Sequence, residues 1–121
     1  MDFDKHVYLC SNGESFFSGL FGLAFLDLSF NKLKKINSNY FKDSKHLFHL
    51  ILSHNQIEYI ETECLPSRLY EIDLSYNQLK SIGSIFQNMS SLYKIYLNSN
   101  KITSLDMAVF ENMPAVVVSN N

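Results

Sequence analysis

The sequence predicts a repeat solenoid of the α/β type, in which short parallel strands stack into a curved sheet. The first observation is a pattern, L-x-x-L-x-L-x-x-N, that recurs down the chain with only apolar replacements at the leucine positions. The second is that N-x-L-x-x-I follows in register after the asparagine in four of these units. The asparagines that anchor the units are Asn31, Asn55, Asn77, Asn100 and Asn121, which makes successive units 24, 22, 23 and 21 residues long.

Alternation within each unit predicts a strand. Successive side chains of a strand point to opposite faces, so a pair such as Leu50 and Leu52 faces the core while the residues beside them face outward. One short strand cannot bury its apolar row, whereas strands stacked about 4.8 Å apart share a continuous core. We expect each asparagine to end its strand at a tight turn, where its amide can bond backbone groups of adjacent units. The convex side should hold loops, turns or short 3-10 segments, with little true α-helix.

A phenylalanine recurs in the second half of the unit. Phe41, Phe86 and Phe110 follow their asparagines by 10, 9 and 10 residues, and Leu65 takes this place in the second unit. In this feature the chain resembles the leucine-rich repeats of extracellular proteins, found in Toll-like receptor ectodomains and in secreted invertebrate immune proteins. The unit lengths lie within the range of roughly 20 to 29 residues typical of such repeats. The resemblance covers residues 20–121, and it implies a concave sheet that binds macromolecular partners.

Length and composition predict a single domain, residues 1–121. We interpret residues 1–22 as a degenerate N-terminal repeat or the remnant of a cap, residues 23–112 as four full repeats, and residues 113–121 as the start of a fifth. Solenoids usually carry polar caps, and this sequence shows no complete cap pattern. We therefore expect the chain to be part of a longer array with flanking repeats or caps missing. The apolar stretch Phe16–Leu26 is assigned to the core, and it is shorter than the roughly 18 residues of a membrane span.

The outward residues of the strands form columns on the sheet, and there we expect a protein partner to bind. The central column consists of Tyr8, Asp27, Ile51, Asp73, Tyr96 and Val117. Its mixture of apolar, aromatic and acidic side chains is typical of interface hot spots. A third column, which includes Ser53 and Ser75, is small and polar. Tyr96 and Asp73, one unit apart, are the expected anchor pair. The full set of predicted partner-binding residues is Tyr8, Phe25, Asp27, Ile51, Glu71, Asp73, Lys94 and Tyr96.

The sequence predicts neither an enzyme nor a metal site, and it indicates no cofactor. His46, His49 and His54 are close in sequence, but the register places them on different sides, and no cysteine or carboxylate stands at ligand spacing. Asp27 and Asp73 share a column two units apart and open to water, which is unsuited to a general acid–base pair. The formal charge of −2 and the absence of basic runs argue against nucleic-acid binding.

The two cysteines and one asparagine raise the questions of a disulfide and of glycosylation. Cys10 is expected on a strand and Cys64 on a return segment two units later, so their offset of roughly 10 Å exceeds the roughly 7 Å Cα separation that a disulfide spans. Each thiol is then either a small half-buried side chain or a partner for a missing segment, which leaves the redox compartment open. Asn88 begins the sequon Asn88-Met89-Ser90, a candidate glycosylation site on the outer wall.

Two functional classes stay open. One is a recognition module, an innate-immune or adhesion ectodomain or secreted protein that docks a protein ligand or co-receptor on the sheet, as the resemblance implies. The other is a cytoplasmic leucine-rich repeat scaffold or regulatory subunit, which the absence of an export signal and the unpaired cysteines favour. Fold alone does not choose between them. An upstream leader with further cysteines would support the first class, and a native start at Met1 would support the second.

Overall fold

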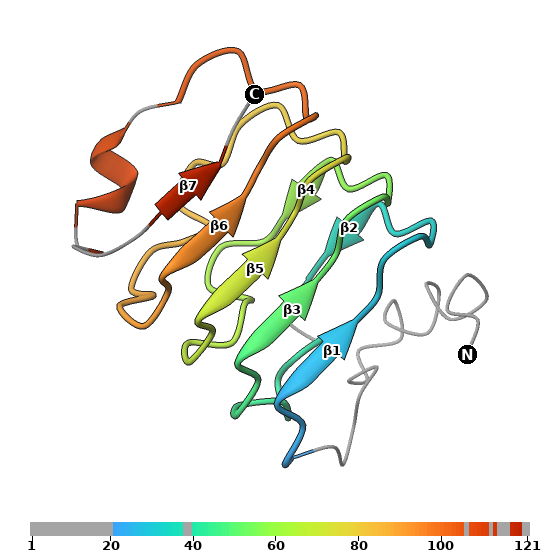
Figure 1. Cartoon of the computed structure of the whole chain (residues 1–121), viewed down its shortest axis with the longest axis vertical. Helices are drawn as coiled ribbons and strands as arrows, with labels where there is room; N and C mark the ends of the chain where they lie inside the picture. The colour runs from blue at the N-terminus through green and yellow to red at the C-terminus, as the bar shows by residue number, and fades with distance from the viewer. Residues whose placement is uncertain (1–20, 38–39, 106, 112, 114–116, 120–121) are drawn as a thin grey trace.

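The computed structural model describes residues 21–37, 40–105, 107–111, 113 and 117–119. Its elements are β1 (Phe25–Asp27), β2 (Lys35–Ile36), β3 (His49–Ile51), β4 (Tyr59–Ile60), β5 (Glu71–Asp73), β6 (Lys94–Tyr96), the 3-10 helix η2 (Met107–Phe110) and β7 (Val117–Ser119). Within these residues β1, β3, β5, β6 and β7 form one parallel sheet in chain order (Figure 1). Each turn of the chain, which we call a rung, adds one strand to the sheet. The predicted fold class is confirmed.

The core lies between this sheet and the return segments, which we call the outer wall. Leu50, Ile72 and Ile95, the inward residues at the centres of β3, β5 and β6, are paired in register and fully buried. Burying one such side chain contributes about 1.5–3 kcal/mol. From the other side, Phe86 and Phe110 fill the core, with ring centroids 6.2 Å apart. The recurring phenylalanine therefore fills core volume that the side chains of the short strands do not fill.

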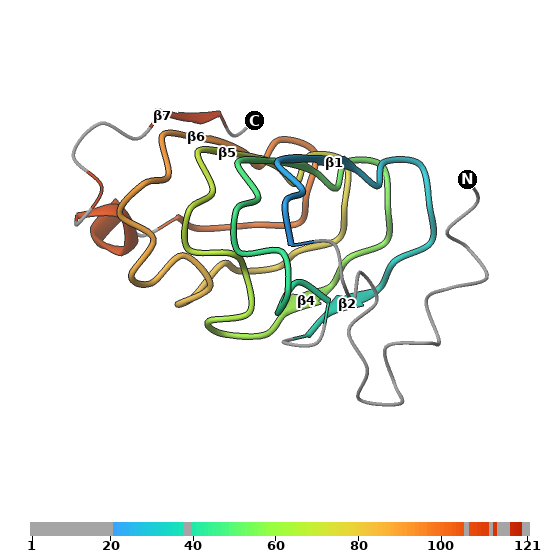
Figure 2. The same ribbon diagram turned by 90° about the horizontal axis from the view of Figure 1, so that it is seen from below.

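A second, two-stranded parallel sheet forms where the sequence predicted loops, turns or 3-10 segments. Strand β2 pairs with β4, which joins Ile36 to Ile60 in register. Figure 2 shows these strands on the side of the core opposite the larger sheet. Ile36 and Ile60 are the isoleucines of the N-x-L-x-x-I segment, and both are buried. Their inward side chains hold the outer wall against the core in the first two described rungs.

The turn after each strand uses a left-handed residue directly before the asparagine. These residues are Phe30, His54, Tyr76 and Ser99, with φ between 56° and 60°. A left-handed conformation costs roughly 1–2 kcal/mol for a residue that is not glycine. Hydrogen bonds between rungs hold it in place: the His54 amide donates to the Ser75 carbonyl at 3.1 Å, and the Tyr76 amide donates to the Asn98 carbonyl at 2.9 Å. The turn conformation is thus stabilised by hydrogen bonds between rungs rather than by a residue type, such as glycine, that favours it.

The register of β7 differs from the predicted one. The repeat pattern aligned Val116 with Ile95, whereas the structure pairs Val118 with Ile95 and Val117 with Lys94. Val117 therefore does not belong to the central column. A shift of two residues leaves every side chain on the same face of the strand, so alternation cannot detect it. Consecutive valines at 116 to 118 offer an apolar inward residue in either register.

The first part of the chain bears on two sequence predictions. Residues 1–20, which include Tyr8 and Cys10, lie outside the described residues. In the remainder of the apolar stretch assigned to the core, Leu23 and Leu26 pack partly against the core, but Phe21 and Phe25 are exposed. Residues 21–26 of the stretch are therefore divided between core and surface. No helix of the described chain is long and apolar enough to span a bilayer.

Candidate functional site

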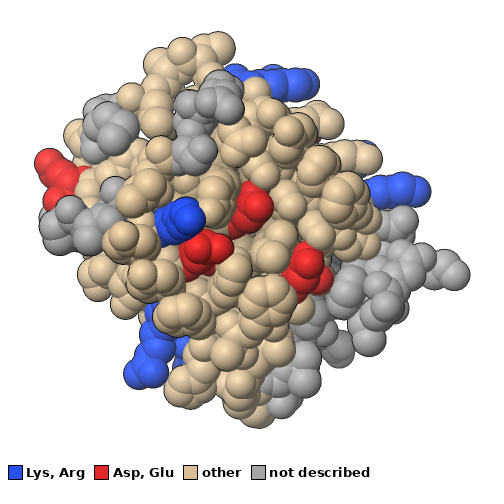
Figure 3. Space-filling model, in the orientation of Figure 1, with Lys and Arg blue, Asp and Glu red and all other residues tan. Residues whose placement is uncertain are grey.

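The outward residues of the five strands form the surface that we call the sheet face. Its first column consists of Phe25, His49, Glu71, Lys94 and Val117, and its second contains Asp27, Ile51, Asp73 and Tyr96. All of these side chains are exposed or partly exposed. Three carboxylates, from Asp27, Glu71 and Asp73, gather here with a single lysine, and Figure 3 shows these charges in the middle of the face. The sheet therefore brings together seven of the eight predicted partner-binding residues, and Tyr8 lies outside the described chain.

Contacts run across the first column from rung to rung. The Phe25 ring meets the His49 ring edge-on with centroids 4.9 Å apart, and His49 Nε2 lies 2.7 Å from Glu71 Oε2. The Lys94 ammonium lies 5.2 Å from the centroid of the Tyr96 ring. Hydrogen bonding to the Tyr96 side chain, with smaller electrostatic contributions that include Glu71, raises the pKa of Lys94 above its ordinary value. Lys94 is therefore a stable cation beside an aromatic anchor.

Two of the acids are tied into the strand ends. Asp73 Oδ1 accepts hydrogen bonds from the Ser75 amide at 2.9 Å and from the Ser75 hydroxyl at 2.6 Å. Asp27 and Ser29 make the same pair of bonds at the same distances. The D-L-S sequence of the first and third described rungs thus forms a local side-chain cap. Only the second carboxylate oxygen of each acid is left for a partner.

The predicted third outward column is wrong at Ser53 and Ser75. Ser53 and Ser75 are only 7% and 6% exposed. The strands end two residues earlier than the alternation suggested, and the chain turns inward at these serines. Their carbonyls accept hydrogen bonds from the amides of Phe30 and His54 in the preceding rung. These two serines therefore belong to the interior of the turn, whereas Ser29 and Asn98, at the same position of their units, are partly exposed.

Each interior asparagine ties two rungs together. The Asn77 side-chain amide donates to the Leu74 carbonyl of its own rung at 3.1 Å and to the Leu52 carbonyl of the preceding rung at 2.9 Å. Its Oδ1 accepts from the Ile57 amide at 2.9 Å. Asn55 and Asn100 make the corresponding bonds one rung away on either side. These bonds satisfy backbone groups that lie beyond the strand ladder.

The two ends of the asparagine series adjoin or lie within parts of the chain that the structure does not describe. Asn31 donates to the Leu28 and Ser29 carbonyls of its own rung at 2.9 and 3.1 Å. Asn121 lies outside the described residues.

Stacked aromatic rings border both long edges of the sheet face. On the edge where the strands begin, Tyr70 stacks on Phe48 with centroids 4.8 Å apart and on Tyr93 at 5.0 Å. On the edge where the strands end, His54 stacks on Phe30 at 4.2 Å and on Tyr76 at 4.3 Å. We call these the leading ladder and the trailing ladder. Apart from His54, which is partly exposed, every ring is at least 38% exposed.

The sequence analysis missed both ladders, although their signal is present. An aromatic residue follows the leading leucine of three units, Phe48, Tyr70 and Tyr93, and an aromatic ring precedes the asparagine in three, Phe30, His54 and Tyr76. These residues flank the strands, so they are not among the outward strand positions that alternation identifies. Because rungs are stacked at the spacing of a parallel sheet, identical positions in successive units place their rings face to face.

The three histidines that are close in sequence occupy separate places. His46 is exposed on the outer wall, His49 lies on the sheet face, and His54 sits within the trailing ladder. In the part of the chain that the structure describes, no three His, Cys, Asp or Glu side chains gather as a metal site. Cys64 is a buried free thiol, not a half-buried one, and Asn88 is exposed on the outer wall.

Known proteins match this architecture in sequence and in structure. The family model for the leucine-rich repeat matches residues 6–65 and 67–118. Lumican from Gallus gallus is 33% identical over 78% of this chain and 34% of its own length, and epiphycan from Mus musculus is 30% identical over 87% and 33%. Among solved structures, TLR13 in the crystal structure of its complex with ssRNA13 superposes with a TM-score of 0.77 and 29% identity, over 87% of this chain and 16% of TLR13. The chain thus spans about a third of the length of the curated relatives that it matches. Since the family model covers most of the sequence, the chain belongs to the leucine-rich repeat family and is a repeat protein of the extracellular type.

Proposed function

We propose that this chain is a recognition module of an extracellular protein and that its sheet face docks a protein partner with a basic surface. The observation that carries the proposal is the composition of that face: it holds the carboxylates of Asp27, Glu71 and Asp73 and one lysine, Lys94, between two aromatic ladders. Complementary charge guides and orients association, and exposed aromatic rings supply the contact area that dominates interface energies.

The relatives support the extracellular setting. Lumican, epiphycan and fibromodulin are secreted proteins of the extracellular matrix, and TLR13 is a receptor with a leucine-rich ectodomain. None of these relatives favours the alternative, a cytoplasmic scaffold. They also belong to families without enzymatic activity, in keeping with a binding role.

A protein partner fits the sheet face better than a nucleic acid. The TLR13 structure holds a single-stranded RNA, which makes RNA the natural competitor. Three carboxylates on the face would repel phosphate groups, and the rings of each ladder already stack on one another, so the inner rings have no free face for a base. Single-stranded RNA therefore serves as a control ligand in the test below.

Affinity capture from extracellular fluid would identify the partner, and calorimetry with the purified pair would test the surface. Tyr96→Ala and Glu71→Gln should each weaken binding by about 1–3 kcal/mol, because the first removes an anchor and the second a charge. Lys80→Ala, at an exposed residue away from the sheet face, should leave the affinity unchanged. Loss of binding with Lys80→Ala but not with Tyr96→Ala would mean that the interface lies outside the sheet face. Saturable RNA binding that Tyr96→Ala weakens would mean that the ligand of the sheet face is RNA and not a protein.

We also propose that Asn88 carries an N-linked glycan when the protein passes through a secretory pathway. Asn88 and Ser90 of its sequon are exposed on the outer wall, away from the sheet face, and Asn88 adopts a left-handed turn with φ of 64°. A glycan there would leave the proposed docking surface open. Protein secreted from eukaryotic cells should lose mass on treatment with peptide N-glycosidase, and the Asn88→Gln variant should not. An unchanged mass for the wild type would reject the site.

A further inference from the structure

The outer wall contains hollows between consecutive rungs, and one of them differs in charge from its neighbours. The hollow between segments 41–46 and 63–68, which we call the basic groove, has a volume of about 630 Å³. A hollow of about 270 Å³ lies one rung on, between segments 63–67 and 85–89, and another of about 410 Å³ lies between segments 83–90 and 108–113. Neither of these two is lined by a lysine or an arginine. The backbone architecture repeats, whereas the charge does not.

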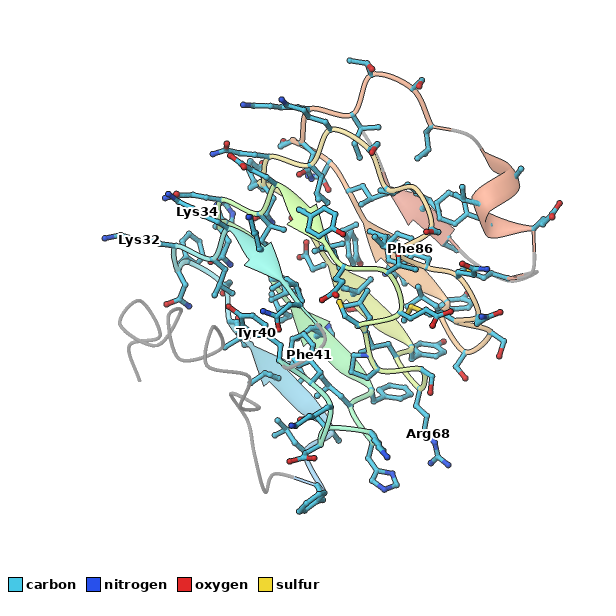
Figure 4. All side chains as sticks on the ribbon, turned by 180° about the vertical axis from the view of Figure 1, so that it is seen from behind. Lys32, Lys34, Tyr40, Phe41, Arg68 and Phe86 are labelled. Carbon is cyan, nitrogen blue, oxygen red and sulfur yellow. The ribbon has the colours of Figure 1, made fainter. Side chains whose placement is uncertain are left out.

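Four basic side chains line the basic groove against one acidic one. Lys42, Lys45, His46 and Arg68 face the single carboxylate of Glu63, so the lining carries a net charge of +2 with His46 neutral. The whole chain carries −2, and Arg68 is its single arginine. The basic residues are exposed, and Figure 4 shows Arg68 extending from the outer wall into solvent. The excess of positive charge is therefore local and within reach of a ligand.

The floor of the basic groove is apolar and uncharged. Phe41, Cys64, Leu65 and Pro66 line it, and all four are buried. Burial raises the pKa of the Cys64 thiol to about 12, so the thiol adds no negative charge at neutral pH. Its Sγ is directed to the Ile36 carbonyl, 3.7 Å away. Positive side chains thus surround an uncharged floor, and Glu63 is the one acidic side chain of the lining.

We propose that the basic groove binds a tetrahedral oxyanion ester, a sulfate or phosphate group carried by a larger ligand. The guanidinium of Arg68 can hold two oxygens of such a group at once, while Lys42 and Lys45 act as point charges. The two hollows described on the following rungs lack cations, so in that direction the described wall offers a site for one or two such groups and no track for a long polyanion. This site lies on the opposite side of the core from the sheet face, so it does not depend on the proposed protein docking.

Calorimetric titration of the purified chain would test the proposal. The sulfate probe is a heparin-type tetrasaccharide, with its desulfated form as control, and the phosphate probe is inositol hexakisphosphate, with inositol as control. At least one of the two probes should bind with a stoichiometry of one, whereas inositol and the desulfated tetrasaccharide, which keeps its carboxylates, should not bind. The probe that binds more tightly identifies the source of the oxyanion. No saturable binding of either charged probe would overturn the proposal.

Matched variants would locate the site. Arg68→Ala should weaken binding about tenfold and Arg68→Lys less, because lysine keeps the charge but loses the two-oxygen geometry. Lys34→Ala and Lys80→Ala each remove one exposed lysine outside the groove and should change the affinity by less than about twofold. Equal losses of affinity in all three alanine variants would indicate diffuse electrostatic attraction and reject the groove as a site. The same conclusion would follow if the affinity for single-stranded RNA increased with RNA length and were unchanged by Arg68→Ala.

Discussion

A single carboxylate oxygen of Asp73 accepts hydrogen bonds from both the backbone amide and the hydroxyl of Ser75. Ser75 is buried two residues after Asp73, the last residue of β5. The acid therefore has two roles: it caps the strand end, and it presents its other oxygen on the sheet face. A substitution at Asp73 would disturb both, so Glu71 and Tyr96 are better residues for testing the docking surface.

Removal of the Ser75 hydroxyl should be measurable as a loss of stability. Ser75→Ala deletes one hydrogen bond at a buried position and should lower the free energy of unfolding by about 0.5–1.5 kcal/mol. Asp73→Ala deletes both bonds and should cost more. Urea denaturation followed by circular dichroism gives both values. If the sequence interpretation of Ser75 as an outward residue were right, Ser75→Ala would cost under about 0.5 kcal/mol.

The interior asparagines should contribute strongly to stability. Asn77→Ala leaves buried backbone groups of two rungs unpaired and should cost about 2–4 kcal/mol, since each unsatisfied group costs about 1–3 kcal/mol. Lys80→Ala, at an exposed residue of the return segment, should cost under about 0.5 kcal/mol. Denaturation midpoints at equal m-values provide the comparison. Equal losses would mean that the bonds between rungs contribute little.

The inward register of β5 predicts a large effect at Leu74. Its side chain is fully buried, so Leu74→Ala should cost about 2–5 kcal/mol through lost burial and the cavity that remains. Val117→Ala on β7, where the side chain is 48% exposed, should cost under about 1 kcal/mol. The same denaturation experiment measures both. A larger loss at Val117 than at Leu74 would contradict the assignment of faces.

The buried thiol of Cys64 should make stability fall in alkaline solution. Burial, reinforced by the charge of Glu61, raises the pKa of Cys64 from 9.0 to about 12. Between these values the unfolded chain has lost the thiol proton while the folded chain keeps it, so stability decreases as pH rises through this window and is unaffected below it. Other groups titrate there too, and the difference between the wild type and Cys64→Ala isolates this contribution. Identical slopes above pH 9 would contradict it.

The same thiol tests the separation of the two cysteines. Cys64 should react slowly with a thiol reagent at pH 8 while the chain is folded, because the thiolate is the reactive form. Unfolded without reductant, the monomer should show two free thiols, Cys10 and Cys64. A count of zero in a monomer would mean that the two are joined.

The sequence alone determined the fold and the main faces of the strands. Leucines and asparagines recur at the rung spacing, and each apolar pair can be buried in only one orientation, so the inward placement of Leu50, Ile72 and Ile95 follows from their periodicity. Periodicity likewise identifies the outward residues Glu71 and Tyr96. Such features depend on the order of residues within one unit, which the sequence contains in full.

Only the tertiary structure decided what depends on distances between rungs. It shifted β7 by two residues, turned Ser53 and Ser75 inward, and stacked Tyr70 between rings of the adjacent rungs. It also brought Arg68 to a groove shared with Lys42 and Lys45 of the preceding rung. Each of these outcomes depends on where a strand ends and how the next return segment lies beside it. Those positions are set by hydrogen bonds and packing between units, which alternation within a single unit does not encode.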